Sequence, residues 1–285
     1  MKTLLGFLFV TASLASGQAA TTINPVNKFA YGANLGWMDW RGDTVNGAVI
    51  GDYVCSGSIY SANVGWINLG NGSPPNLVRY QNTFANDFGV NHDGLGNLRG
   101  YAYGANIGWI NFENTGAPKV DLATGKFSGS AYSANCGWIS LSNAFAYVQT
   151  DSFDPGVLAP NGLPVPWLIS NFGTTNLNAS GDVDGDGMSN VQEYLAGTNP
   201  NDANDKLVIT TYSTTPGGTL ATVTWKSVPT RGYYIQQTLD LTTPVWFDSG
   251  LGLIAPDGAS TTRTFADTNA PVRFYHVRAV RPLAP

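Results

Sequence analysis

The stretch 182–193, DVDGDGMSNVQE, combines carboxylates at a spacing that suits a metal ion. Asp182, Asp184 and Asp186 occupy loop positions 1, 3 and 5, and Glu193 occupies position 12. Gly187 stands at position 6, where such a loop must turn sharply. This pattern supplies the several oxygen ligands on a flexible loop that Ca²⁺ takes. The sequence therefore predicts a calcium site.

Two further residues complete the predicted ligand set. Met188 at position 7 offers its backbone carbonyl, and Asn190 stands at position 9. Mg²⁺ is the less suitable ion because it demands a regular octahedral geometry. The alternative interpretation is an acidic, solvated Asp-Gly turn without a metal. Three carboxylates placed so closely repel one another without a cation, which favours the calcium site.

The remaining titratable residues form no pattern that is typical of catalysis. Glu113 and the scattered aspartates give no pair of facing carboxylates of the kind a glycosidase needs. His92 falls in a turn-like stretch and His276 on an expected strand, and neither belongs to a zinc or nucleophile motif. The sequence therefore predicts a protein that is not an enzyme.

A turn followed by a tryptophan recurs four times in the first half of the chain, as in YSANVGWI at 60–67. The tryptophans are Trp37, Trp66, Trp109 and Trp138, and 72 residues separate the first from the third and the second from the fourth. This indicates a two-unit module duplicated as a block. Two roles are open for these tryptophans. The alternation after each favours a place in the core between units; an exposed row would instead bind a ligand such as a sugar.

Each repeat unit is expected to be a three-stranded antiparallel meander, so that four units build a β domain over 20–150. The Asn-x-Gly sequence closes the last turn of each unit. The residue between Asn and Gly is always apolar: Leu35, Val64, Ile107 or Cys136. We therefore expect the turn tips to be covered by the next repeat or by a partner.

The chain has two cysteines, Cys55 and Cys136. An even number of cysteines in an oxidising compartment favours a disulfide. The alternative is a pair of small, buried thiols.

The second half of the chain divides into three segments by composition. Prolines and glycines over 151–164 predict a linker, and 165–205 predicts a helix-loop-helix around the acidic loop. Alternating strands over 206–285 predict a small β-sandwich of fibronectin or immunoglobulin type. The expected fold class is therefore mostly β, with a short α-helical calcium module.

The N-terminus and the charge bear on location and partners. Residues 1–19 have the basic, apolar and small-residue regions of a signal peptide, and no later apolar run has the length of a transmembrane helix. The net charge is −5 and the basic residues are scattered, which argues against a nucleic-acid partner. We expect a secreted protein in the extracellular space or on the cell surface.

The stretch GDVDGDGMSNVQEYLAGTNPND resembles the calcium loops of dockerins and of thrombospondin type 3 repeats. It is especially similar to a version in secreted bacterial proteins in which a β-sandwich tail often follows. A cohesin-binding dockerin carries two such loops, whereas this chain has one, so the resemblance implies a calcium-stiffened spacer. The N-terminal repeats resemble G-x-A-W-x-x-N-x-G-W-I repeats of exported bacterial proteins.

Together these features predict a secreted, calcium-binding, non-enzymatic protein with a structural, adhesive or interaction role. Its partner would be a glycan or another surface protein. One alternative is a carbohydrate-binding accessory protein in polysaccharide degradation. A second alternative is the subunit of a self-assembling surface fibre, if the turn tips or strand edges associate between molecules.

Overall fold

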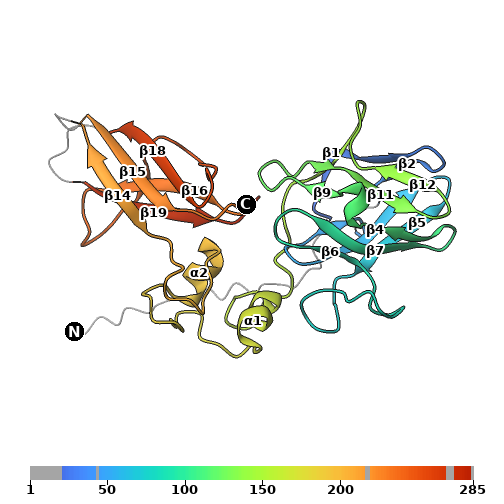
Figure 1. The fold of residues 1–285 in the computed structure, drawn as a ribbon, viewed down its shortest axis with the longest axis horizontal. Helices are drawn as coiled ribbons and strands as arrows, with labels where there is room; N and C mark the ends of the chain where they lie inside the picture. The colour runs from blue at the N-terminus through green and yellow to red at the C-terminus, as the bar shows by residue number, and fades with distance from the viewer. Residues whose placement is uncertain (1–20, 43–44, 216–218, 268–272, 284–285) are drawn as a thin grey trace, which may run out of the picture.

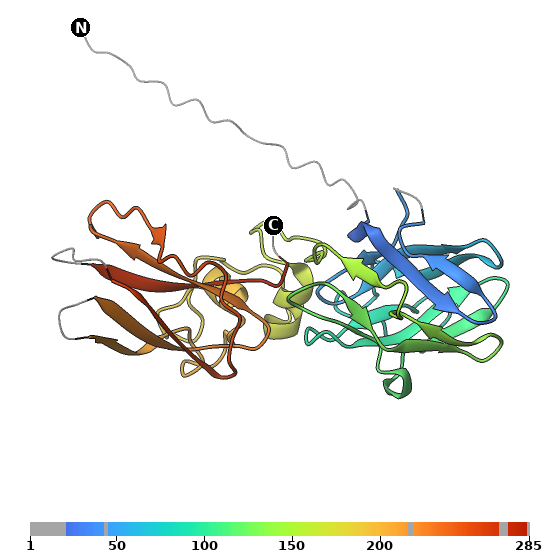
Figure 2. The ribbon, with the colours of Figure 1, turned by 90° about the horizontal axis from the view of Figure 1, so that it is seen from above.

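The computed structural model describes residues 21–42, 45–215, 219–267 and 273–283, so the predicted signal peptide lies outside the described residues. The fold is mostly β, which confirms the predicted fold class. Figure 1 shows a barrel formed by the N-terminal half, two short helices, and a second β domain formed by the C-terminal part. In the view of Figure 2 the helices lie between the two β domains.

Eight strands of the repeats close into an antiparallel barrel. They are β1 (Ile23–Gly32), β2 (Gly36–Asp39), β4 (Cys55–Ser61), β5 (Gly65–Asn71), β7 (Leu98–Gly104), β8 (Gly108–Asn111), β11 (Ser130–Ser133) and β12 (Gly137–Ser140). Each strand pairs with the next in this order, and β12 pairs back onto β1. The four junctions between hairpins use equivalent residues, so the barrel has approximate fourfold repetition.

Shorter strands of the repeat units lie outside the closed set of eight strands. They are β3 (Val49–Ile50), β6 (Val90–His92), β9 (Lys119–Val120), β10 (Phe127–Ser128) and β13 (Val148–Thr150), and a 3₁₀ turn spans Asn114–Gly116. β3 and β6 each open a three-stranded unit, as the sequence predicts. The first unit has no such opening strand among the described residues. β13, from the far end of the domain, pairs with β1 in its place.

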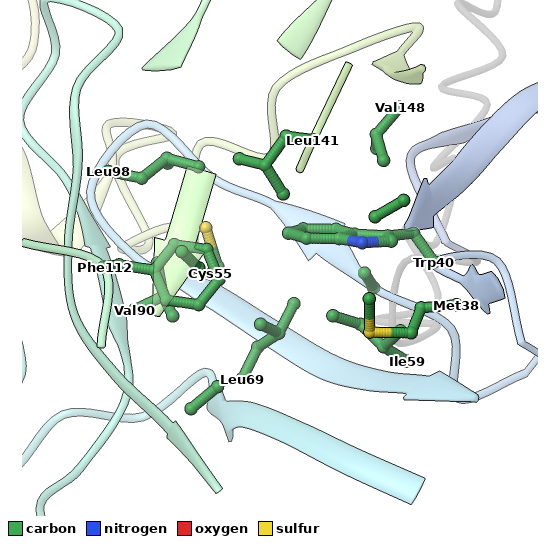
Figure 3. Packing of buried hydrophobic residues seen from close by; sticks show 14 of the residues in the cluster. Met38, Trp40, Cys55, Ile59, Leu69, Val90, Leu98, Phe112, Leu141 and Val148 are labelled. Atoms are coloured by element: carbon green, nitrogen blue, oxygen red, sulfur yellow. The ribbon is translucent and has the colours of Figure 1, made fainter. Parts of the chain in front are cut away.

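The barrel interior is filled by the residue that follows each repeat tryptophan. Met38, Ile67, Ile110 and Ile139 are buried there. Trp40 packs among them, with its ring 5.3 Å from that of Phe127, and Figure 3 shows Trp40 between Leu141 and Met38. Eight strands leave an interior just wide enough for such side chains. Because side chains alternate along a strand, the preceding tryptophan points outward. The favoured prediction that the four tryptophans form the core is therefore wrong.

The four Asn-x-Gly turns join in a ring at one end of the barrel. In each, the asparagine Nδ2 donates to the carbonyl of the apolar turn residue in the neighbouring unit. The bonds run from Asn34 to Cys136 (3.1 Å), from Asn63 to Leu35 (3.0 Å), from Asn106 to Val64 (3.0 Å) and from Asn135 to Ile107 (2.9 Å). Leu35 and Ile107 are buried, and Val64 and Cys136 pack against the core. The neighbouring repeat thus covers the tips, one of the two expected arrangements.

The predicted disulfide is wrong, because both cysteines are free. Cys136 lies in the turn ring, whereas the Cys55 side chain lies in the barrel interior near Phe112 (Figure 3). Cys55 begins β4 and the ring is reached only after Ser61, so about 20 Å of strand separates the two levels. A disulfide requires Cβ atoms about 4 Å apart. Burial raises the pKa of the Cys55 thiol to about 12, so it remains protonated.

The segment predicted as a linker is packed against its surroundings. Phe153 is buried in the barrel core, and Leu163 belongs to a small cluster with Trp167 and Tyr194 of the helices α1 (Val165–Phe172) and α2 (Asn190–Ala196). Within its described residues, the C-terminal domain contains two three-stranded sheets. One contains β14 (Ile209–Thr214), β15 (Leu220–Lys226) and β18 (Ser260–Ala266), and the other β17 (Phe247–Asp248), β16 (Gly232–Thr238) and β19 (Phe274–Val280).

Candidate metal centre

The acidic loop lies between α1 and α2 and gathers its three aspartates. Asp182, Asp184 and Asp186 each present a carboxylate oxygen, and these oxygens lie within 4.8 Å of one another. Sequence spacing brings them together, since alternate residues of a loop that curls on itself face the same centre. The predicted cluster of three aspartates is therefore present in the fold.

Two left-handed glycines shape the loop. Gly185 has φ +79° and Gly187 has φ +96°, values that side chains with a Cβ rarely adopt. Their amides donate to Asp182, from Gly185 N to Oδ1 over 2.7 Å and from Gly187 N to Oδ2 over 2.9 Å. These bonds, that of Gly187 foremost, hold the pKa of Asp182 below its usual range. Asp182 is thus anionic and fixed at position 1.

Glu193 brings a fourth carboxylate from α2. Its side chain is fully buried, its Oε1 accepts a long bond of 3.5 Å from Thr198 Oγ1, and its Oε2 has no partner among the described residues. Burial raises the pKa of Glu193 to about 7, and the charges of Asp184 and Asp186 add to the effect. The charge of a divalent cation in the loop would stabilise the Glu193 carboxylate and so lower this pKa.

Four oxygens of residues in this loop and at the start of α2 are buried and lack a hydrogen-bond partner among the described residues: Asp184 Oδ2, Asp186 Oδ2, Asn190 Oδ1 and Glu193 Oε2. They occupy positions 3, 5, 9 and 12 of the loop. Buried polar atoms without a donor are unfavourable, and carboxylate oxygens more so than neutral ones. Carboxylate and amide oxygens are the ligand types that Ca²⁺ takes, so the chemistry of these residues is compatible with that ion.

The residues beside the loop tie it to the C-terminal domain. The side chain of Met188, predicted to offer its carbonyl, packs against the core of that domain, and its Sδ accepts from Leu207 N over 3.3 Å. Lys206 Nζ donates to the carbonyl of Asp186 over 3.0 Å. Asn190 Nδ2 donates to the carbonyl of Asn178 over 2.8 Å, which fixes the amide at position 9.

The turn of α2 that carries Glu193 also holds the two β domains together. Arg231 of the C-terminal domain donates from Nη2 to the carbonyl of Tyr194 over 3.0 Å and from Nε to that of Leu195 over 2.9 Å. The Tyr194 ring lies 5.6 Å from that of Trp167, with the Arg281 guanidinium 5.5 Å above it. Tyr194, which follows the predicted calcium ligand Glu193, therefore lies at the centre of this contact between the two β domains. We call this contact the joint.

An ion pair completes this joint. Arg281 Nη2 lies 2.5 Å from Asp52 Oδ2 of the barrel, across 229 residues of sequence. Burial raises the pKa of Asp52, although the charges of Arg281 and Arg231 oppose the rise. No local signal in the sequence marks Asp52, Arg231 or Arg281. Only the tertiary fold brings them together, and for this reason sequence reasoning missed them.

Both histidines have structural partners. His92 is buried, with Nδ1 2.9 Å from the carbonyl of Gly51 and Nε2 accepting from Gly96 N over 3.1 Å. His276 stacks on Trp246 at 3.8 Å and lies 2.8 Å from Gln236 Oε1. Burial lowers the pKa of each imidazole, so both are neutral at pH 7. These contacts give neither histidine a metal-binding or catalytic geometry.

The four repeat tryptophans lie far from the acidic loop in sequence, on the outer surface of the barrel. Each is 46–49% exposed and packs against a tyrosine of the paired strand, with ring centroids 4.9–5.0 Å apart. The pairs are Tyr31–Trp37, Tyr60–Trp66, Tyr103–Trp109 and Tyr132–Trp138. The tryptophans thus form a belt around the barrel, where the sequence left open whether they were core or surface.

Fold and site together define a mostly β protein with a closed repeat barrel, an acidic loop at its joint and a two-sheet domain. No family model, curated protein or solved structure matches the chain. In the described part of the chain, no helix is long and apolar enough to cross a membrane.

Proposed function

We propose that this protein is a secreted, calcium-binding, non-enzymatic structural or interaction protein, and that calcium stiffens the joint between its two β domains. The observation that carries the proposal is the group of four buried, unpartnered oxygens around the acidic loop. Clustered carboxylates without a cation repel one another, and burial adds the cost of lost hydration. A bound calcium ion removes both costs.

One short helix, α2, connects the predicted calcium site to the joint between the two β domains. Glu193 belongs to the ion site, whereas Tyr194 and Leu195 accept the hydrogen bonds of Arg231. Helix α2 has seven residues, too few to be stable in isolation. Its order therefore depends on what holds its two ends. Calcium at the N-terminal loop fixes the helix, and the helix then presents the carbonyls and the Tyr194 ring to both β domains.

The extracellular setting suits this role. Calcium loops of extracellular modules bind with a Kd of about 10⁻⁴–10⁻³ M, which makes them saturable only where calcium is abundant. The closed barrel pairs each of its eight strands on both sides, so it offers the fibre alternative no free edge in that part of the chain. A monomeric structural or interaction protein is the form that we favour.

Thermal unfolding of the full secreted chain tests calcium binding. Calcium at 100 times its Kd stabilises the native state by about 2.7 kcal/mol, so chelation lowers the melting temperature and added calcium restores it. Magnesium at the same concentration restores less, because it tolerates an irregular site poorly. The variant Glu193→Gln keeps the shape of the side chain but removes its charge, and we expect it to lose the response to calcium.

A matched control is Asp202→Asn, which removes the charge of an exposed aspartate nine residues beyond Glu193 in the same module. It should keep the full response. The proposal fails if wild-type protein melts at the same temperature in calcium and in chelator. It also fails if Glu193→Gln and Asp202→Asn respond alike.

A further inference from the structure

The belt of Tyr–Trp pairs is repeated four times, but its surroundings are not. At each junction between hairpins, the tyrosine pairs in register with one polar residue of the adjacent strand. These residues are Asp39, Asn68, Asn111 and Ser140. The fourfold repetition provides an internal comparison, because the same aromatic platform stands beside four different polar groups.

Three of the four polar residues are committed to internal contacts. Asp39 pairs with Lys28 over 2.7 Å. Asn68 Oδ1 accepts from Gly70 N over 2.6 Å, and Ser140 Oγ donates to the carbonyl of Ser142 over 2.8 Å. The fourth, Asn111, lines a hollow of the surface, and its side-chain amide makes no hydrogen bond among the described residues. Such an amide is available to a ligand.

A hollow of about 200 Å³ lies beside this amide. It is lined by Trp138, Tyr132, Asn111, Glu113, Thr115 and Gly116. Gly116 permits close packing at this hollow, since a Cβ there would lie 1.9 Å from the carbonyl of Ser130 and 3.0 Å from the Trp138 ring. The hollow is smaller than a typical drug-sized pocket, so it suits a single ring.

Glu113 adds a free carboxylate to the hollow. Its side chain is exposed and makes no ion pair or hydrogen bond within the described residues. In the first block of the duplication, 72 residues earlier, Arg41 stands at this position, and its guanidinium is bonded to the carbonyl of Ile23. Among the described residues, which leave out Asp43 and Thr44, the equivalent place beside Trp66 keeps its aromatic platform, but its Asp39 carboxylate is paired with Lys28. The two blocks have diverged in the polar lining while keeping the aromatic one.

We propose that the hollow at Trp138 binds one pyranose ring of a neutral polysaccharide. A pyranose has an apolar face of C–H groups that stacks on an indole and a rim of hydroxyl groups that donate to carboxylate and amide oxygens. Trp138 supplies the platform, Glu113 supplies an exposed acceptor, and the amide of Asn111 adds a polar group to the lining. The carboxylate and the net charge of −5 disfavour acidic sugars. This inference is independent of the calcium loop.

The geometry favours a sugar over a cationic side chain. The ring centroids of Trp138 and Tyr132 lie 5.0 Å apart with their planes inclined by 59°, so the two rings meet at an angle and the indole alone offers a flat face. A cage for an ammonium group instead surrounds the cation with several ring faces. The uncommitted amide of Asn111 also matches a neutral hydroxyl partner. One stacked ring with two or three hydrogen bonds implies a Kd of about 10⁻⁴–10⁻³ M for a single chain segment.

Affinity electrophoresis of the full chain tests the proposal, with native gels that contain a soluble β-glucan, xylan, mannan or galactan. We expect at least one of these polysaccharides to retard the protein. Trp138→Ala and Glu113→Gln should weaken binding by at least about tenfold, whereas Trp66→Ala, which removes an equivalent exposed ring, should bind as wild type does. Circular dichroism and melting temperature check that each variant is folded, and Glu113→Gln is a surface change that leaves the fold intact.

Three outcomes would overturn the proposal. One is no retardation by any of the four polysaccharides. Another is equal loss in Trp66→Ala and Trp138→Ala, which would assign the effect to the belt as a whole. The third is displacement of the bound polysaccharide by choline at millimolar concentration, which would make the hollow a site for cations. Calcium and chelator should give the same retardation, which separates this test from that of the metal centre.

Discussion

The ion pair between Asp52 and Arg281 gives a prediction whose size follows from its surroundings. The side chains are 19% and 15% exposed, so the pair is mostly, though not fully, removed from water. Replacement of Arg281 by Met leaves the Asp52 carboxylate without its closest cation. A fully buried pair broken in this way costs about 3–5 kcal/mol, and the residual exposure reduces our expectation to about 2–3 kcal/mol.

The pH dependence of this penalty has a definite sign. The folded-state pKa of Asp52 is raised by burial and by Asp154, and Arg281 and Arg231 oppose the rise. A carboxyl with a raised pKa opposes folding increasingly as the pH rises through that pKa. Loss of Arg281 raises the pKa of Asp52 further. The penalty of Arg281→Met should therefore be largest at about pH 8 and smaller at about pH 5, where the carboxyl can take up a proton.

Urea unfolding followed by tryptophan fluorescence measures these differences in the free energy of unfolding. The double variant Asp52→Asn/Arg281→Met leaves no unpaired charge, and we expect it to be more stable than Arg281→Met by about 1–2 kcal/mol at about pH 8. Equal penalties at both pH values would refute the reasoning. So would a double variant whose penalty is the sum of the two single penalties.

Three further predictions concern the barrel. Trp40→Ala removes a fully buried indole and should lower the free energy of unfolding by about 3–5 kcal/mol in a urea titration. A change of less than about 1 kcal/mol would contradict the place of Trp40 in the core. Asn135→Ala deletes the hydrogen bond of the turn ring to the carbonyl of Ile107 and should lower the free energy of unfolding by about 0.5–1.5 kcal/mol in the same assay. An unchanged free energy of unfolding would mean that this bond does not stabilise the closed barrel. A thiol reagent should modify Cys136 in native protein and Cys55 only after unfolding, and non-reducing mass analysis should find both thiols free. A mass lower by two hydrogen atoms would instead indicate the disulfide.

Local patterns in the sequence predicted the elements that depend on nearby residues. The Asn-x-Gly turns and the alternation around each repeat gave the hairpins, and the spacing from Asp182 to Glu193 gave the acidic loop. These features follow from turn chemistry and from the side-chain period of two, which a short stretch of sequence contains in full. The C-terminal strands were recognisable for the same reason.

Features that depend on distant contacts were missed or mistaken. Closure of the barrel rests on the pairing of β12 with β1, and nothing within either strand specifies that partner. The orientation of the tryptophans depends on which face of the strand becomes the interior, and a shift of one residue reverses it. The disulfide prediction failed because Cys55 and Cys136 lie at different heights of a barrel whose topology the sequence did not reveal.

Hydrogen exchange of the full chain, with and without calcium, tests the central claim most directly. If calcium fixes α2 and α2 holds the joint, calcium slows amide exchange in two places. The first is the loop and helix over 182–198. The second is the part of the C-terminal domain around Arg231, whose guanidinium donates to the carbonyls of Tyr194 and Leu195 in α2. Protection confined to 182–198 would leave a calcium site that does not act on the joint, and unchanged exchange in both places would contradict the account.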